Sequence, residues 1–224
     1  KYIQSNINAF VNLLECCKNF NINRLVYASS SSVYGNTKTV PFNEKDNVDS
    51  PVSLYAATKK SNELLANVYS HLYKIETIGL RFFTVYGPWG RPDMAISLFT
   101  NAIVNNQPIK VFNEGKLSRD FTYIDDVIEG LVNILLNNSK DKSLNKIYNI
   151  GNGNPIKLFD FINEIEKELR VNAQKKLLPM QPGDVSITYA DTNKLYNDFG
   201  FKAKTSLSDG VKAFISWYKS YFIS

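Results

Sequence analysis

A tyrosine and a lysine four residues apart are the first side chains in this sequence whose spacing could support chemistry. They are Tyr55 and Lys59. Residues at positions i and i+4 share one face of a helix. An ammonium close to a phenol favours the phenolate, so a tyrosine placed in this way can act as a general base or acid. On spacing alone, an ordinary contact on a helix surface is the simpler interpretation.

A run of four serines is the second candidate. It occupies positions 29–32 and directly follows the short, largely apolar run 24–28. Ligands of open α/β sheets bind at the carboxyl ends of the strands, and serine hydroxyls there can both donate and accept hydrogen bonds. A polar turn is the alternative interpretation, since serines favour turns. Strand-end serines followed by a helix that carries Tyr55 and Lys59 would assemble one site, so the two features together indicate chemistry.

The elements that must position these residues alternate between helix and strand. Apolar spacing predicts helices at 6–20, 54–73, 94–106, 124–138, 156–170, 192–199 and 207–221, and strands at 24–28, 77–83, 109–112, 146–150 and 175–178. The order strand, helix, strand implies a right-handed crossover in a parallel sheet. The expected fold is α/β: the C-terminal part of a doubly wound, Rossmann-like parallel sheet with a smaller α/β substrate-binding domain.

The loop at 86–92 interrupts this alternation and suggests a domain boundary. We expect residues 1–87 to be the remainder of the Rossmann domain. Residues 88–224 would mainly form the substrate-binding domain, with 120–150 returning to the Rossmann sheet.

Composition excludes several other classes of protein. Hydrophobic residues make up 44% and charged residues 21%, as in ordinary globular proteins, and no apolar run approaches the length of a membrane helix. The net charge of +5 comes from scattered lysines rather than a basic stripe, which argues against nucleic-acid binding and suits an anionic small substrate. The two cysteines, Cys16 and Cys17, are adjacent, so we expect a reducing, cytoplasmic compartment. No Cys/His cluster has zinc spacing.

Longer stretches resemble the extended short-chain dehydrogenases. They are VYASSSSVYG at 26–35, YAATK at 55–59 and LRFFTVYGP at 80–88. Four further stretches are similar to the UDP-glucuronate 4-epimerases in particular: GPWGRPDMA at 87–95, RDFTYIDD at 119–126, YNIG at 148–151 and QPGDV at 181–185. The resemblance runs from Tyr2 to Tyr218.

This resemblance implies a redox-neutral reaction with NAD as the cofactor. Tyr55 would take the proton from the sugar 4-hydroxyl while NAD accepts a hydride from C4, and the 4-keto sugar would then turn and be reduced on its other face. Lys59 would assist Tyr55 and bind the nicotinamide ribose, and Ser30 would hydrogen-bond the same hydroxyl. Ser29 and Phe82 would join Tyr55 and Lys59 in binding the cofactor.

The resemblance also implies the sugar-nucleotide contacts, at Ser30, Ser31, Thr84, Arg91, Val111, Phe112, Arg119 and Asp184. Thr84 stands where UDP-galactose epimerases tend to carry asparagine. The planar fork of Arg91 beside the Thr84 hydroxyl would clamp a carboxylate, as glucuronate requires. An arginine that faces solvent or pairs with Asp93 is the alternative.

The remaining substrate contacts would hold the nucleotide. Val111 and Phe112 would lie beside the uracil, Arg119 at the diphosphate and Asp184 at a ribose hydroxyl. Gln181 replaces an arginine of the UDP-galactose epimerases, so phosphate binding would rest more heavily on Arg119.

Two departures from the related families bear on the activity. The 4,6-dehydratases carry acidic residues where this chain has Ser31 or Ser32, and serine is a poor acid for eliminating water. None of the eleven glycines forms the Gly-x-x-Gly-x-x-Gly loop that cradles the NAD pyrophosphate. By resemblance we therefore expect about 100 residues to be missing before Lys1.

The leading hypothesis is a UDP-glucuronate 4-epimerase that makes UDP-galacturonate for surface polysaccharide. Alternatives are a UDP-glucose or UDP-N-acetylglucosamine 4-epimerase, the decarboxylase that makes UDP-xylose, and a catalytically silent sugar-nucleotide-binding fragment. The resemblance further implies a homodimer in which helices 6–20 and 55–73 pack as a four-helix bundle.

Overall fold

A computed structural model describes residues 1–181 and 185–223. The chain divides into two compact units. Unit 1 comprises Lys1–Phe83, Leu131–Ile150 and Ala190–Phe201, and unit 2 comprises Thr84–Gly130, Gly151–Tyr189 and Lys202–Ser224. Each unit is therefore assembled from three separate stretches of chain.

Unit 1 is built on a parallel sheet with the strand order β1-β2-β7. The strands are β1 (Arg24–Ser30), β2 (Glu76–Phe82) and β7 (Asn145–Ile150). The register pairs Ser30 with Phe82 and Phe82 with Ile150, so all three carboxyl ends lie level with one another. Ile78, Leu80, Tyr148 and Ile150 are fully buried, as expected for the middle of a parallel sheet.

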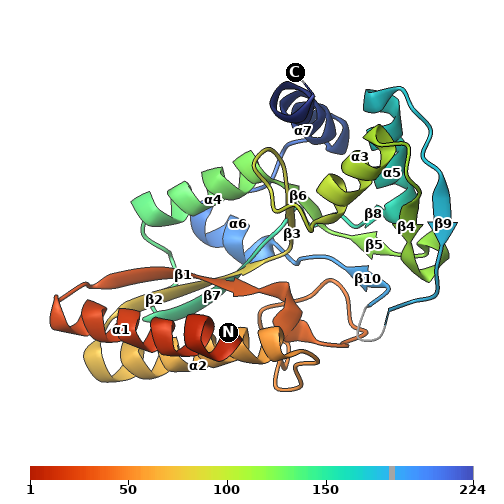
Figure 1. The fold of residues 1–224 in the computed structure, drawn as a ribbon. Helices are drawn as coiled ribbons and strands as arrows, with labels where there is room; N and C mark the ends of the chain where they lie inside the picture. Colours follow the sequence, from red (N-terminus) through yellow and green to blue (C-terminus); the bar gives the residue numbers. More distant parts are fainter. Residues whose placement is uncertain (182–184, 224) are drawn as a thin grey trace. The chain divides into compact units, whose positions relative to one another are not determined.

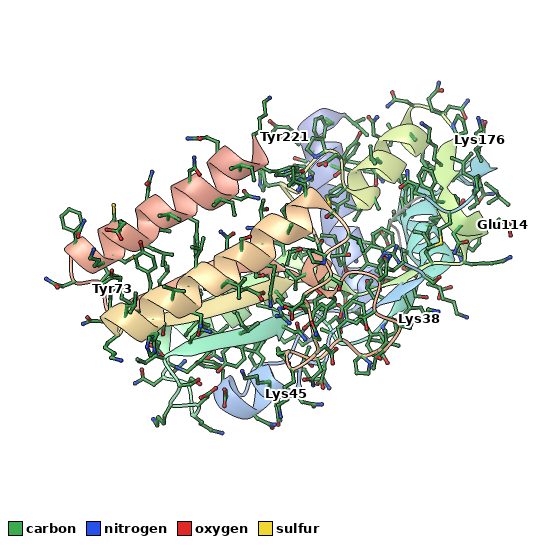
Figure 2. The ribbon with its side chains drawn as sticks, turned by 90° about the horizontal axis from the view of Figure 1, so that it is seen from below. Lys38, Lys45, Tyr73, Glu114, Lys176 and Tyr221 are labelled. Carbon is green, nitrogen blue, oxygen red and sulfur yellow. The ribbon has the colours of Figure 1, made fainter. Side chains whose placement is uncertain are left out.

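The helices of unit 1 are α1 (Ala9–Asn19), α2 (Leu54–Tyr73), α6 (Asn193–Phe199) and the second half of α4 (Ile124–Leu136). A π-helical stretch at Ile3–Asn8 leads into α1, and a 3-10 turn at Ser31–Tyr34 follows β1. α1 and α2 run side by side on one face of the sheet, with Tyr73 at the far end of α2 (Figures 1 and 2). α2 begins where the Ser53 hydroxyl accepts a hydrogen bond from Ala56 N and ends at Lys74 in the left-handed conformation.

Unit 2 contains small sheets and helices around a second core. The strands pair as β3 (Thr84–Tyr86) with β6 (Phe121–Tyr123), β4 (Ile109–Val111) with β9 (Lys175–Leu177), and β10 (Ile187–Thr188) and β8 (Ile156–Lys157) on either side of β5 (Ser118–Arg119). The helices are α3 (Ala95–Val104), the first half of α4, α5 (Leu158–Leu169) and α7 (Leu207–Phe222), and a 3-10 turn lies at Phe112–Gly115. Phe161, Ile165, Val211 and Phe214 are fully buried in this core.

The observed division differs in detail from the one expected at 87/88. Unit 1 ends its first stretch at Phe83, four residues earlier, and the returning segment is Leu131–Ile150 rather than 120–150. The segment Ala190–Phe201, which carries α6, also belongs to unit 1. α4 spans the division, and a continuous apolar helical pattern gives no sign of such a change of unit.

Candidate active site

The serine run occupies the carboxyl end of β1 and the turn after it. Because side chains alternate along a strand, Ser29 and Ser30 point to opposite faces. The Ser30 hydroxyl accepts a hydrogen bond from Ser32 N at 3.1 Å and donates one to Ser32 Oγ, so it shapes the turn that contains Ser31. Ser30 is nearly buried and Ser31 is half-buried.

Tyr55 and Lys59 share one face at the start of α2, as their spacing predicts. Lys59 Nζ lies 5.9 Å from the centre of the Tyr55 ring and donates a 3.0 Å hydrogen bond to the carbonyl of Ala28 on β1. Ala28 precedes Ser30 by two residues, so α2 brings its tyrosine and lysine to the strand end that carries the serines. The structure thus places the three predicted catalytic residues in one unit, at one edge of the sheet.

The half-buried state of Lys59 has an electrostatic consequence. Burial lowers the pKa of Lys59, because removing the ammonium from water disfavours its charged form. An ammonium that has lost part of its water also interacts more strongly with a neighbouring phenol than an exposed one does, since the local dielectric constant is lower.

Side chains around this strand end fit the ribose and nicotinamide side of an NAD molecule. Tyr55 and Lys59 offer a hydroxyl and an ammonium on one helix face, and Phe82 supplies a half-buried aromatic surface level with Ser30. The Ser29 hydroxyl does not join them, because it donates a 2.6 Å hydrogen bond to Glu63 inside the unit. Its predicted contact with NAD gains no support from this geometry.

The predicted carboxylate clamp belongs to unit 2. Thr84 begins β3, and its backbone N–H donates to the carbonyl of Asp120 at 3.1 Å. Arg91 lies in the loop after β3, and its Nε donates to Asp93 Oδ1 at 3.0 Å in a two-point ion pair. Both side chains of this pair are largely exposed, at 75% and 63%. The structure therefore contains the Arg91–Asp93 ion pair that the alternative interpretation predicts.

The predicted nucleotide contacts also lie in unit 2, on three different segments. Arg119 is half-buried on β5 and donates to the carbonyls of Ser118 and Ser186. Val111 is fully buried and its carbonyl accepts a 2.9 Å hydrogen bond from Leu178 N, whereas Phe112 is partly exposed. Asp184 lies outside the described residues.

Sequence reasoning missed two charged residues beneath the serine run, Glu63 and Arg81. They form a buried ion pair within unit 1. Glu63 follows Lys59 by four residues, which places it on the same face of α2, and Arg81 is a charged residue between Leu80 and Phe82. Both signals were available, but neither identifies the partner of the other residue.

A parallel sheet with serine, tyrosine and lysine at its carboxyl edge defines a short-chain dehydrogenase type of protein. The family model described as "NAD dependent epimerase/dehydratase family" matches residues 1–151. The chain belongs to this family.

Individual relatives match nearly the whole of this chain. Protein CapI of Staphylococcus aureus is 51% identical over 99% of this chain and 70% of its own length. UDP-glucuronate 4-epimerase 4 of Arabidopsis thaliana is 45% identical over 99% of this chain, which spans only 54% of that protein. The crystal structure of a Bacillus cereus UDP-glucuronic acid 4-epimerase with UDP-glucuronic acid and NAD matches with a TM-score of 0.91 at 35% identity, over 99% of this chain and 69% of that one.

These comparisons confirm three of the predictions. The α/β fold with a Rossmann-like sheet, the class of NAD-dependent nucleotide-sugar epimerases and NAD as the cofactor are all borne out. The roles of the individual site residues remain predictions. Among the described residues, no helix is long and apolar enough to cross a membrane, and no group of His, Cys, Asp and Glu side chains could hold a metal ion.

Proposed function

We propose that this chain carries the catalytic and sugar-nucleotide-binding residues of a UDP-glucuronate 4-epimerase that forms UDP-galacturonate. The observation that carries the proposal is the placement of Tyr55 and Lys59 on one face of α2, with Lys59 hydrogen-bonded to Ala28 of β1, two residues before Ser30. The relatives named for UDP-glucuronate 4-epimerisation support the choice of substrate.

In this reaction the chain's own residues handle a proton and hold the sugar. Tyr55 removes the proton from the 4-hydroxyl, and Lys59 stabilises the phenolate that makes this possible. The Ser30 hydroxyl, which donates to Ser32 Oγ in the structure, would turn to donate to the same oxygen and fix its distance from Tyr55. Tyr55, Lys59 and Phe82 would hold NAD, which would supply a reversible hydride acceptor at C4, so the reaction would have no net redox change. Tyr55 then gives its proton back to the oxygen at C4.

The carboxylate of glucuronate would bind at Arg91. Its guanidinium already holds the two oxygens of Asp93, which is the geometry that a substrate carboxylate needs. Exposed ion pairs contribute only about 0–1 kcal/mol, so a substrate can replace Asp93 at little cost. A hydrogen bond from the Thr84 hydroxyl would complete the clamp.

The test is to incubate the purified protein with NAD⁺ and UDP-glucuronate and to separate the products by chromatography. UDP-galacturonate is the expected product. UDP-xylose would indicate the decarboxylase instead, and turnover of only UDP-glucose or UDP-N-acetylglucosamine would change the substrate. Binding of a UDP-sugar without any turnover would favour the silent binding fragment.

Tyr55→Phe provides the decisive variant. It removes only the hydroxyl, so turnover should vanish while calorimetry still detects binding of UDP-glucuronate. Tyr69→Phe, on the same helix but far along it, is the matched control and should keep its activity. Retained turnover in Tyr55→Phe would contradict the proposed mechanism.

We also propose that two copies of the chain associate through α1 and α2. The two helices expose Leu13, Leu64, Val68 and Leu72. Exposed apolar side chains gathered on neighbouring helices are typical of a protein–protein interface. Analytical ultracentrifugation should detect a dimer, and Leu64→Asp should dissociate it; an unchanged sedimentation coefficient would exclude this face.

The free thiols of Cys16 and Cys17 support a cytoplasmic location, and UDP-galacturonate would serve polysaccharide synthesis.

A further inference from the structure

Directly beneath the candidate site lies an ion pair that is almost completely removed from solvent. Arg81 on β2 and Glu63 on α2 are 3% and 6% exposed. Arg81 Nε donates to Glu63 Oε1 and Nη2 donates to Oε2, both at 2.9 Å. This two-point geometry fixes both the distance and the orientation of the helix relative to the strand.

The same carboxylate also ties α2 to β1. Glu63 Oε1 accepts the hydrogen bond from Ser29, whose partner in the sheet register is Arg81. One turn earlier on α2, Lys59 donates to the carbonyl of Ala28. The helix is therefore bonded to β1 at two successive residues, immediately before Ser30.

The opposite side of Arg81 supports the turn that follows β1. Its guanidinium carbon lies 4.8 Å from the centre of the Tyr34 ring, within the range of a cation–π contact. The Tyr34 hydroxyl in turn donates to Asn149 Oδ1 at 2.7 Å, and burial raises the pKa of Tyr34 to about 12. The residue that holds α2 is thus also packed against the turn that contains Ser31.

Burying such a pair is costly, and apolar residues of similar volume often stabilise a protein equally well. Burial alone would lower the pKa of Arg81, but the hydrogen bonds and charge of Glu63 raise it above its ordinary value, so the guanidinium keeps its charge. A contribution to stability alone therefore gives little reason for an ion pair at this place.

We propose that Arg81 and Glu63 are positioning residues. They hold the face of α2 that carries Tyr55 and Lys59 at a fixed distance and orientation from the turn that follows β1. The inference rests on the proposed function, since it assigns the pair a role in that reaction. Neither residue touches the substrate. Their effect is exerted through Lys59 and Tyr55 on one side and through Ser29 and Tyr34 on the other.

The experiment compares kinetics with thermal stability in three variants. Glu63→Gln breaks the pair, and Glu63→Gln combined with Arg81→Met replaces both charges by neutral side chains. Glu76→Gln is the matched control, because it breaks an ion pair of the same unit at the opposite end of β2.

In Glu63→Gln and in the double variant, a shift of α2 relative to β1 should lower kcat about 10- to 100-fold, since small misplacements of reacting groups have effects of this size. The KM for UDP-glucuronate should stay within about twofold, because the substrate contacts remain. The double variant should recover most of the Tm lost in Glu63→Gln but none of the kcat. Glu76→Gln should lose Tm and keep its kcat.

Recovery of kcat together with Tm in the double variant would overturn the proposal, as would an equal loss of kcat in Glu76→Gln. If Glu63→Gln does not fold, Arg81→Lys keeps the charge but loses the two-point fork, and the same loss of kcat is expected.

A second readout needs no turnover. Lys59 should become several-fold more reactive toward acetic anhydride in the double variant, relative to the exposed Lys38 and Lys45 of the same chain. Unchanged Lys59 labelling would overturn the positioning role. Labelling that changes in a protein without any turnover would leave the positioning role intact and contradict only the proposed function.

Discussion

Glu76 is expected to stabilise unit 1 in a way that depends on pH. Its carboxylate begins β2 and binds two cations: Lys146 Nζ donates to Oε1 at 2.6 Å, and Arg24 Nε donates to Oε2. The Lys146 side chain is only 3% exposed, whereas that of Glu76 is 20% exposed. The substitution Glu76→Gln therefore leaves a buried ammonium facing a neutral amide.

The magnitude follows from the two bonds. A hydrogen bond to a charged group contributes about 1.5–3 kcal/mol, and the glutamine carbonyl can keep one neutral bond of about 1 kcal/mol. The net loss in the free energy of unfolding at pH 7 is then about 2–5 kcal/mol. For a chain of this length, such a loss corresponds to a fall in Tm of about 4–20 °C.

The pH dependence gives the sharper test. Burial by itself would raise the pKa of Glu76, but the hydrogen bonds from Arg24 and Lys146 outweigh it and lower the pKa below its ordinary value of 4.5. A lowered pKa in the folded state means that the stabilisation is fully present above pH 4.5 and is lost as the pH falls through the folded-state pKa. The variant and the parent protein should therefore converge in stability at low pH.

The assay is thermal and urea unfolding followed by circular dichroism from pH 7 down to pH 3. Glu129→Gln breaks an exposed ion pair with Lys204 and is the control; it should leave Tm unchanged. If the difference in Tm and in the free energy of unfolding between the parent protein and Glu76→Gln is as large at pH 3 as at pH 7, the electrostatic explanation is refuted.

Three further substitutions test other parts of the chain. Arg91→Ala should raise the KM for UDP-glucuronate at least about tenfold but leave that for UDP-glucose nearly unchanged, and equal effects in steady-state assays would remove the carboxylate argument. Ser53→Ala deletes the cap that accepts from Ala56 N and should cost about 1 kcal/mol in urea unfolding, a loss that Ser53→Asp should avoid. Gly115→Ala should destabilise by about 2 kcal/mol or more in the same assay, because φ is +78° and a Cβ would lie 2.1 Å from the Phe159 ring; a neutral result would argue against this turn.

The long elements could be predicted from the sequence because each carries its own local signal. The helix predicted at 54–73 is observed at Leu54–Tyr73, since Ser53 caps one end and Lys74 terminates the other. The apolar run at 24–28 likewise marks the buried strand β1, which continues to Ser30. Because Tyr55 and Lys59 are four residues apart, predicting this helix was enough to place both side chains on one face.

The strands of unit 2 were harder to predict because they are short. β5, β8 and β10 contain two residues each, too few to show any alternation of apolar and polar side chains. Their pairing joins segments far apart in the chain, as when Ser118 pairs with Ile187. The division between the units follows from such pairings, and no local pattern in 120–150 indicates it.

The pairing of β1 with β2 is the part of the site that the sequence could not predict. Lys59 and Glu63 are one helical turn apart, so a sequence pattern predicts that both face the sheet. What it cannot predict is which strand residue meets each of them, because a one-residue shift of β1 against β2 would pair Arg81 with Ser30 instead of Ser29. In that arrangement the Ser30 hydroxyl would lie beside the guanidinium, and the predicted catalytic serine would lose its place. In the observed register Ser29 lies beside Arg81, and both donate to Glu63, so α2 is bonded to both strands only while this register is kept.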